Sequence, residues 1–203
     1  MKLIGMLDSP YVRRVAISAK CLGIELEHEP VSVFRHFERF QQINPTVKAP
    51  TLVLDDGEVL MDSTLILDYL EAVARPVASL MPDDLSQRVR ALRLIGLSLA
   101  ACEKSVQLYY ERNLRPADIQ YQPWIERVEG QLAAAYTVLE HELQKQPLPT
   151  DVPLAQDGIS LAVAWSFTNL VVADQVDAGR FPLIAQYTAY AETLHAFKSC
   201  PMT

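Results

Sequence analysis

The sequence is poor in cysteine, has no long apolar run and carries no excess of basic charge. Its three cysteines (Cys21, Cys102 and Cys200) are far apart and the four histidines show no ligand spacing, which argues against a disulfide framework or a structural metal site. No apolar run approaches the roughly 18 residues that a membrane-spanning helix requires. The 18 basic and 25 acidic side chains give a net charge of −7, whereas a general nucleic-acid-binding protein is expected to be basic. We therefore expect no membrane, nucleic-acid or metal partner.

The first residues carry no recognisable targeting signal. The segment 1–8 has one basic residue and an acidic residue at position 8, which is unlike a secretory signal. Together with the scattered cysteines, this predicts a cytoplasmic protein in a reducing compartment. The chain has 203 residues, of which 50% are hydrophobic, and this is enough for one large or two small globular domains with a buried core.

The first 75 residues combine short apolar runs with helical periodicity. The expected elements are strands at 3–7, 24–33, 50–54 and 58–61, and helices at 10–22, 34–43 and 62–73. A β-α-β start makes the first two strands parallel, and a turn containing Asp56-Gly57 predicts a hairpin. We therefore predict a small mixed sheet with helices packed on it.

The remainder of the chain is helical in pattern. Residues 76–84 contain two prolines, break the helical periodicity and are expected to form a linker. The helices expected after it begin at Leu85 and continue at 123–144, 161–172 and 183–197. The pattern thus predicts two domains, an α/β domain at 1–75 and an all-α domain at 85–203.

Ser9 is the first candidate functional residue. It falls at the N-cap of the first expected helix and at the carboxyl end of the first strand, where open α/β sheets bind ligands. A thiol bound there would be stabilised as the thiolate by the hydroxyl and by the positive end of the helix dipole. In the alternative interpretation, Ser9 only caps the helix.

Two further candidates lie at 49–50 and 62–63. A cis Ala49-Pro50 bond would expose the backbone of Ala49 to an extended peptide-like ligand, although most X-Pro bonds are trans. Asp62 and Ser63 open another helix, where the carboxylate could take an ammonium group and the hydroxyl with the helix amides could take a carboxylate. The alternative for this pair is again simple capping.

Three stretches, taken together and in order, carry a family resemblance: SPYVRRV at 9–15, NPTVKAPTL at 44–52 and DSTLILDYLE at 62–71. They closely resemble the glutathione S-transferase family, and most of all its small bacterial members with a Ser-Pro start. The resemblance implies a thioredoxin-like N-terminal domain with a mixed four-stranded sheet, followed by an all-helical C-terminal domain.

The resemblance also implies a role for each matching residue. The positions expected to bind glutathione are Ser9, Lys48, Ala49, Pro50, Asp62 and Ser63. Ser9 matches the catalytic serine that bonds the glutathione sulfur. Ala49 matches the residue whose backbone pairs with the cysteinyl part, ahead of the family's cis-proline. The acidic-Ser pair matches the one that holds the γ-glutamyl end, and Lys48 is expected to meet the glycine carboxylate.

The activity implied by the resemblance is that of a cytoplasmic, homodimeric glutathione transferase in detoxification. Glutathione would be a cosubstrate, with no other cofactor, and its thiolate would attack a small hydrophobic electrophile held between Tyr11, Tyr110 and the C-terminal helices. Two alternatives remain open at this point. One is glutathione-dependent disulfide reduction or isomerisation, and the other is a non-catalytic binding module with the same fold.

The sequence departs from the family pattern at two places. Asp8 puts a negative charge next to the expected thiolate, which would oppose ionisation if the side chain points inward. The family's Ser/Thr-x-x-Asp capping box is expected at Ser160, but Val163 stands where the acid belongs, so the reciprocal hydrogen bond would be missing. Arg13 is expected to face the sheet edge or a salt bridge rather than the ligand.

Overall fold

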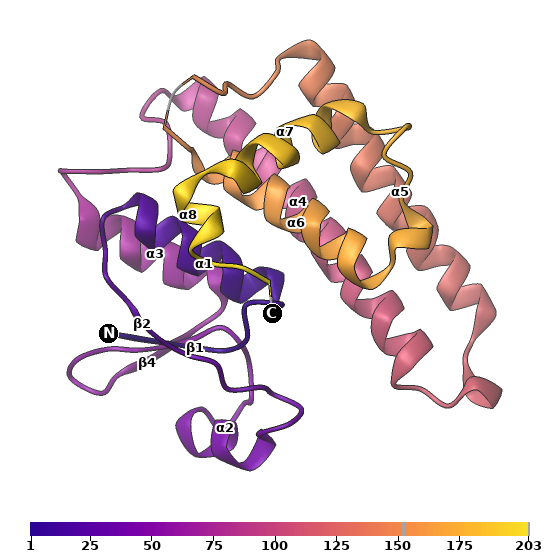
Figure 1. Cartoon of the computed structure of the whole chain (residues 1–203), viewed down its shortest axis with the longest axis horizontal. Helices are drawn as coiled ribbons and strands as arrows, with labels where there is room; N and C mark the ends of the chain where they lie inside the picture. Colours follow the sequence, from indigo (N-terminus) through magenta and orange to yellow (C-terminus); the bar gives the residue numbers. More distant parts are fainter. Residues whose placement is uncertain (152, 203) are drawn as a thin grey trace. The chain divides into compact units, whose positions relative to one another are not determined.

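The computed structural model of the chain describes residues 1–151 and 153–202. These residues form two compact units, which are described separately. Unit 1 comprises Met1–Met81 together with Thr193–Thr203, and unit 2 comprises Pro82–Glu192. No helix within the described ranges combines the length and the apolar character that crossing a bilayer requires. Figure 1 labels the elements along the chain.

The sheet of unit 1 has four short strands in the order β2-β1-β3-β4. The strands are β1 (Lys2–Ile4), β2 (Glu27–Glu29), β3 (Thr51–Val53) and β4 (Val59–Met61). β1 runs parallel to β2 and antiparallel to β3, and β3 and β4 form an antiparallel hairpin. The mixed four-stranded sheet that the sequence predicts is therefore confirmed, with strands shorter than expected.

Three helices surround this sheet: α1 (Pro10–Cys21), α2 (Phe37–Ile43) and α3 (Ser63–Ala74). Figure 1 shows α1 and α3 above the sheet and α2 below it. α1 fully buries Val12 and Val15, as its apolar spacing predicts. On the α2 side, Phe40 and Ile4 are fully buried and Ala49 packs against them. The core on this side thus anchors the loop that carries Ala49.

The C-terminal segment does not continue as the single helix expected at 183–197. The structure has α7 (Pro182–Thr193) and α8 (His195–Lys198), because Leu194 between them adopts an extended conformation with φ −77° and ψ 149°. After this break, the Nε of Arg13 donates to the carbonyl of Cys200 over 2.8 Å, and its guanidinium lies 5.3 Å from the centre of the Phe197 ring. Residues 193–202 consequently group with unit 1.

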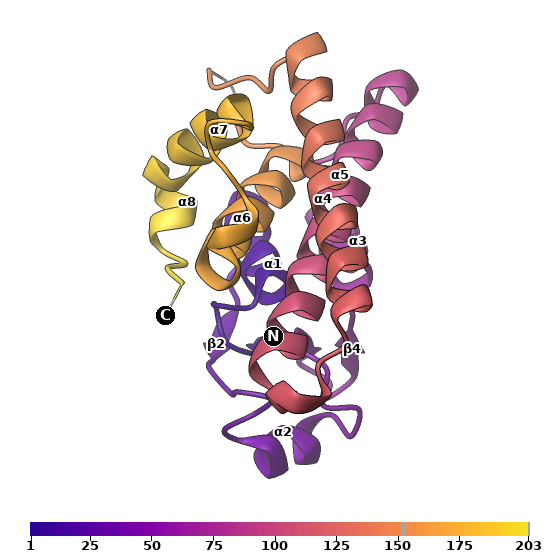
Figure 2. The ribbon, with the colours of Figure 1, turned by 90° about the vertical axis from the view of Figure 1, so that its right-hand side faces the viewer.

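Unit 2 is built from α4 (Leu85–Asn113), α5 (Gln122–Lys145), α6 (Gln156–Val171) and α7, with short 3-10 turns η1 (Ala117–Ile119) and η2 (Ala173–Gln175). α4 lies against both α5 and α6, and Figure 2 shows α4 and α5 side by side. In the buried centre, the hydroxyl of Tyr136 donates to the carbonyl of Ala164 over 3.1 Å and lies 2.6 Å from the Thr168 hydroxyl. A hydrogen-bonded core therefore joins α5 to α6.

Ser160, whose hydroxyl is expected to remain from the family's incomplete capping box, does not lie at the start of α6. α6 already begins at Gln156, with Ala155 at the N-cap, so Ser160 lies inside the helix and accepts a bond from the Gln156 side chain. Asp157 accepts from the N–H of Gly158 over 2.9 Å. A side chain at Gly158 would collide with the hydroxyl of Tyr187. The first turn of α6 is thus fixed by Asp157 and by close packing rather than by a reciprocal capping pair.

Candidate functional site

The N-terminus of α1 carries Ser9 at its N-cap, as predicted, but the hydroxyl does not cap the helix. Ser9 has φ −70° and ψ 123°, and its side chain makes no capping hydrogen bond. Its backbone is fixed instead, since its carbonyl accepts from the N–H of Arg13 over 2.9 Å. The first turn contains no acidic residue. The positive end of this helix therefore meets no carboxylate of its own, and the half-buried hydroxyl is not committed to capping.

Gly5 sets the path from β1 to Ser9. It has φ +139°, a conformation that L side chains rarely adopt, and a Cβ on it would lie 2.6 Å from Val12 Cγ2 and 3.2 Å from Ala49 Cβ. Its carbonyl accepts a 2.7 Å hydrogen bond from Nε2 of His28. The missing side chain thus lets the end of β1 approach both α1 and the loop at Ala49.

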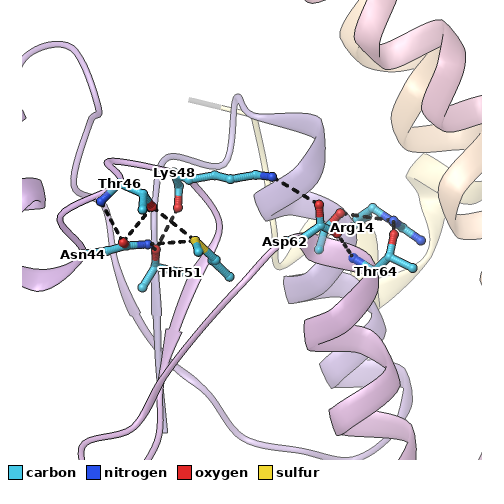
Figure 3. Close-up of polar contacts among 9 residues, drawn as sticks. Arg14, Asn44, Thr46, Lys48, Thr51, Asp62 and Thr64 are labelled. Carbon is cyan, nitrogen blue, oxygen red and sulfur yellow. Dashed lines mark hydrogen bonds and ion pairs between the residues drawn. The ribbon is translucent and has the colours of Figure 1, made fainter.

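The loop before β3 contains a cis Ala49-Pro50 bond, as the family resemblance implies. The buried side chain of Asn44 organises this loop, donating to the Thr51 hydroxyl over 2.8 Å and accepting from the backbone N–H and the hydroxyl of Thr46 over 3.0 and 2.8 Å. Figure 3 shows this cluster beside Lys48. The side-chain network holds the backbone around Ala49 in place.

The N-terminus of α3 is capped and charged. Asp62 has φ +72°, and its Oδ1 accepts from the N–H of Thr64 over 2.9 Å. Its Oδ2 lies 3.3 Å from Nζ of Lys48, which reaches across from the loop (Figure 3). Burial acts to raise the pKa of Asp62, but the hydrogen bonds from Thr64 and Lys48 outweigh it and hold the pKa below its ordinary value. A carboxylate is therefore kept ionised at the start of this helix.

Arg14 belongs to the same cluster, although no sequence pattern places it at the site. It projects from α1 and its Nη1 lies 3.2 Å from the hydroxyl oxygen of Ser63 and 3.3 Å from that of Thr64. Arg14 and Ser63 are both buried. The Arg13-Arg14 pair is visible in the sequence, but nothing local says which of the two faces α3. The structure thus gathers Lys48, Asp62 and Ser63 with an additional cation.

In unit 2, Tyr110 lies on α4 with 42% of its surface exposed. It lines an open hollow of about 520 Å³ together with Gln107, Glu111, Leu114, Arg115, Pro116 and Trp124. Burial raises the pKa of the Tyr110 phenol, and the neighbouring Tyr109 raises it further. This hydroxyl therefore stays protonated at neutral pH. Tyr11, the other residue expected at an electrophile, belongs to unit 1.

No group of three or more His, Cys, Asp or Glu side chains within residues 1–151 and 153–202 could hold a metal ion. Of the cysteines, Cys21 lies at the end of α1, and burial followed by the nearby Cys200 raises its pKa to about 11. A thiol with that pKa is almost wholly protonated at neutral pH and is a poor nucleophile.

Known proteins that are similar to this chain in sequence have the same kind of fold. Residues 3–77 match the family described as "Glutathione S-transferase, N-terminal domain". An uncharacterised GST-like protein of Escherichia coli K12, YibF, is 30% identical over 166 residues, which are 81% of each chain. The maleylacetoacetate isomerase of Pseudomonas aeruginosa is 29% identical over 143 residues, which are 66% of this chain and 67% of the isomerase. A glutathione-bound glutathione S-transferase from Methylobacillus flagellatus superposes with a TM-score of 0.89 at 25% identity, covering 100% of this chain and 99% of the other.

Proposed function

This chain belongs to the glutathione S-transferase family, and we propose that it binds glutathione on unit 1 and transfers its thiolate to an electrophilic carbon of a small hydrophobic substrate. The observation that carries the proposal is the start of α3, where one carboxylate and two hydroxyls lie beside two cations. Such a set suits the ammonium and carboxylate of a free amino-acid end, because each charge meets an opposite charge or a matching hydrogen-bond partner. The relative from Methylobacillus flagellatus, whose structure contains glutathione, supports the same ligand.

In this proposal, the γ-glutamyl end binds at α3. Asp62 takes the ammonium group, while the hydroxyl of Ser63 and the backbone amides at the helix start take the α-carboxylate. The ligand ammonium competes with Lys48 for Asp62, and Lys48 is then available for the glycine carboxylate at the other end of glutathione. Ala49, ahead of the cis-proline at position 50, pairs through its backbone with the cysteinyl part.

Ser9 is the proposed activating residue. Its hydroxyl is not used for capping and donates a hydrogen bond to the glutathione sulfur at the positive end of α1. This lowers the thiol pKa, so the proton leaves to solvent and the thiolate predominates. The sulfur then forms a bond to the electrophilic carbon, and the displaced electron pair leaves with the substrate's leaving group or moves along its conjugated system.

Tyr110 in unit 2 is the proposed contact of the electrophile, and Tyr11 in unit 1 is a separate candidate for such a contact. Tyr110 opens onto the hollow of unit 2 together with the exposed side chains of Leu114 and Trp124. Apolar and aromatic surfaces of this kind suit a small hydrophobic substrate. Phe variants of each tyrosine separate a hydroxyl contribution from a packing contribution in the turnover of the same electrophile.

A second candidate is glutathione-dependent isomerisation, which the similarity to the Pseudomonas aeruginosa isomerase favours. The thiolate would add to a conjugated carbon, a bond would rotate, and the thiolate would leave again, so that glutathione is regenerated. The first step uses the same residues. A mechanism based on a protein thiol, as in disulfide reduction, is not favoured, because the raised pKa of Cys21 leaves little thiolate.

Calorimetry with glutathione, followed by a turnover assay, tests the proposal. We expect glutathione to bind and to be consumed stoichiometrically with a conjugating electrophile such as a halonitroarene. Catalysed change of a conjugated substrate without consumption of glutathione would favour isomerisation. Binding without turnover of either kind would favour the non-catalytic module, and absence of glutathione binding would overturn all three.

We also propose a homodimer in the cytoplasm. Leu85, Val89 and Leu92 are spaced along one face of α4 and expose 75%, 58% and 54% of their surface. A second copy of the chain would cover this apolar face. Light scattering should give twice the mass of one chain at low micromolar concentration, and Val89→Glu should reduce it to that of one chain. A single-chain mass for the unaltered protein would contradict the dimer.

A further inference from the structure

Two adjacent arginines of α1 are directed to different parts of unit 1. Arg13 and Arg14 are 2% and 3% exposed. Arg13 bonds the carbonyl of Cys200 and lies over the ring of Phe197. Arg14 instead lies within 3.2 and 3.3 Å of the hydroxyl oxygens of Ser63 and Thr64. Arg13 and Arg14 are thus alike in residue type, burial and position in the chain, and they differ in the groups that they contact.

The chemistry of the guanidinium determines the direction of the Arg14 hydrogen bonds. Arginine has five N–H donors, no acceptor, and stays protonated at any working pH. In both contacts, therefore, the hydroxyl oxygen must be the acceptor. The hydrogen atoms of Ser63 and Thr64 then point away from Arg14 and are available as donors. A hydroxyl that already accepts from a cation is also a stronger donor, because hydrogen bonds in a chain polarise one another.

A site that presents two donors backed by a buried positive charge is suited to an anion. Asp62 stands next to these hydroxyls and is kept ionised, so a second position suited to a cation lies beside the first. The hydroxyls of Ser63 and Thr64 therefore favour a negatively charged group, and the carboxylate of Asp62 favours a positively charged one. A ligand that carries both an α-ammonium and an α-carboxylate satisfies them together.

We propose that Arg14 is a positioning residue that makes the start of α3 demand the α-carboxylate of its ligand, acting through the hydroxyls of Ser63 and Thr64. This inference rests on the proposed binding of glutathione at α3. It narrows the ligand class to thiols that carry a free α-amino-acid end. Recognition of the α-carboxylate of that end is attributed to Arg14.

Three ligands separate the two halves of the selection. Glutathione has both charged groups, 4-aminobutyryl-cysteinylglycine lacks the α-carboxylate, and glutaryl-cysteinylglycine lacks the α-ammonium. We expect Arg14→Met to weaken glutathione binding by about 10- to 100-fold, the effect of losing a hydrogen bond to a charged group. Binding of the 4-aminobutyryl analogue should hardly change, so the preference for the carboxylate collapses. The preference for glutathione over the glutaryl analogue depends on Asp62 and should persist.

Two variants control this result. Arg13→Met removes an equally buried arginine that contacts the C-terminal segment, so it should lower the melting temperature and leave all ligand preferences unchanged. Arg14→Lys keeps a cation that can donate to the hydroxyls and should restore part of the carboxylate preference. A purely structural role for Arg14 predicts instead that Arg14→Met weakens the three ligands equally, and that outcome overturns the proposal.

Thr64→Val keeps the inference testable if Arg14→Met does not fold. It removes one of the two hydroxyls at an exposed position and retains the backbone N–H that Asp62 binds. The carboxylate preference should fall by about 2- to 10-fold, and an unchanged preference would count against the proposal. If the unaltered protein binds none of the three ligands, the proposed function fails. If it binds glutathione and these variants keep its preference, only the role of Arg14 fails.

Discussion

The two helix starts in unit 1 resemble each other in sequence and differ in what surrounds them. α1 begins with Ser9 and Pro10, has no acidic residue in its first turn and uses no side-chain cap. α3 begins with Asp62 and Ser63, is capped by the carboxylate and lies against Lys48 and Arg14. Both have the positive end of a helix dipole. At α3 that end already faces a carboxylate, whereas at α1 no acidic side chain of the first turn faces it.

One backbone feature, a helix N-terminus, can therefore serve two kinds of ligand group. The uncapped start of α1 suits a single negative charge such as a thiolate, which would supply what a capping carboxylate supplies elsewhere. The charged start of α3 suits a group that carries both signs. α1 also forgoes the stabilisation of about 1 kcal/mol that a side-chain cap typically contributes.

Asp62→Ala should have the largest effect, because it removes both the cap of α3 and the proposed partner of the ligand ammonium. We expect glutathione affinity to fall by about 10- to 100-fold and the free energy of unfolding to fall by about 1 kcal/mol. Calorimetry and urea denaturation measure the two effects. Asp84→Ala is a matched control, since Asp84 caps α4 in unit 2 by the same kind of bond, and it should reduce stability without changing affinity.

Ser9→Ala should act on the thiol and hardly on stability. Losing a hydrogen bond of about 1.5–3 kcal/mol to the thiolate should raise the pKa of bound glutathione by roughly one to two units. Because the hydroxyl makes no capping bond, the melting temperature should stay near that of the unaltered protein. Ultraviolet titration of the bound thiolate measures the shift. An unchanged thiol pKa would rule out Ser9 as the activating residue and direct attention to Tyr11.

Lowering the pH should destabilise the N-terminus of α3 before that of α1. The pKa of Asp62 is below its ordinary value in the folded protein, so its contribution to stability is complete above the unfolded-state pKa of about 3.9 and is lost as pH falls through the lower, folded-state pKa. The protection of the Thr64 amide against hydrogen exchange, relative to the intrinsic exchange rate at each pH from about pH 6 to about pH 2, should fall over that window. Asp62→Asn should abolish this fall, and an unchanged pH dependence of the protection in that variant would contradict the assignment.

Lys48→Met should have the smallest effect. Lys48 and Asp62 form a largely exposed ion pair, and such pairs contribute about 0.2–1 kcal/mol. The variant also frees Asp62 for the ligand ammonium while removing the proposed partner of the glycine carboxylate, so the two effects oppose each other. Glutathione affinity should change by less than about 5-fold and become less sensitive to salt. A loss comparable to that of Asp62→Ala would mean that Lys48 carries the binding.

The sequence predicts the local features of unit 1 well, because each is determined by a few neighbouring residues. The hairpin at Asp56-Gly57 and the helix starts at Ser9 and Asp62 follow from turn and capping chemistry. β1 is shorter than expected because the strand ends before Gly5, whose φ of +139° no strand residue shares. These features position most of the candidate site.

The parts that sequence patterns miss depend on distant contacts or on exact register. Arg14 meets Ser63, 49 residues away, and Arg13 meets Cys200, 187 residues away, so nothing in the local pattern could assign their roles. The apolar pattern continues through Leu194, so the sequence pattern does not reveal the break between α7 and α8 at this residue. The sequence pattern places the start of α6 too late because Ser160 is a good capping residue by type, whereas the helix begins five residues before the expected position 161, with Ala155 at its N-cap.

The bond between Arg13 and Cys200 has a consequence for the order of events during synthesis on the ribosome. Translation proceeds at about 5–20 residues per second, so roughly 10–40 s separate the two partners. Throughout that interval the whole of unit 2 emerges and is free to fold. The N-terminal unit meanwhile holds a guanidinium whose carbonyl acceptor does not yet exist. Synthesis of unit 1 therefore begins first and ends last, and the helices of unit 2 are synthesised in between.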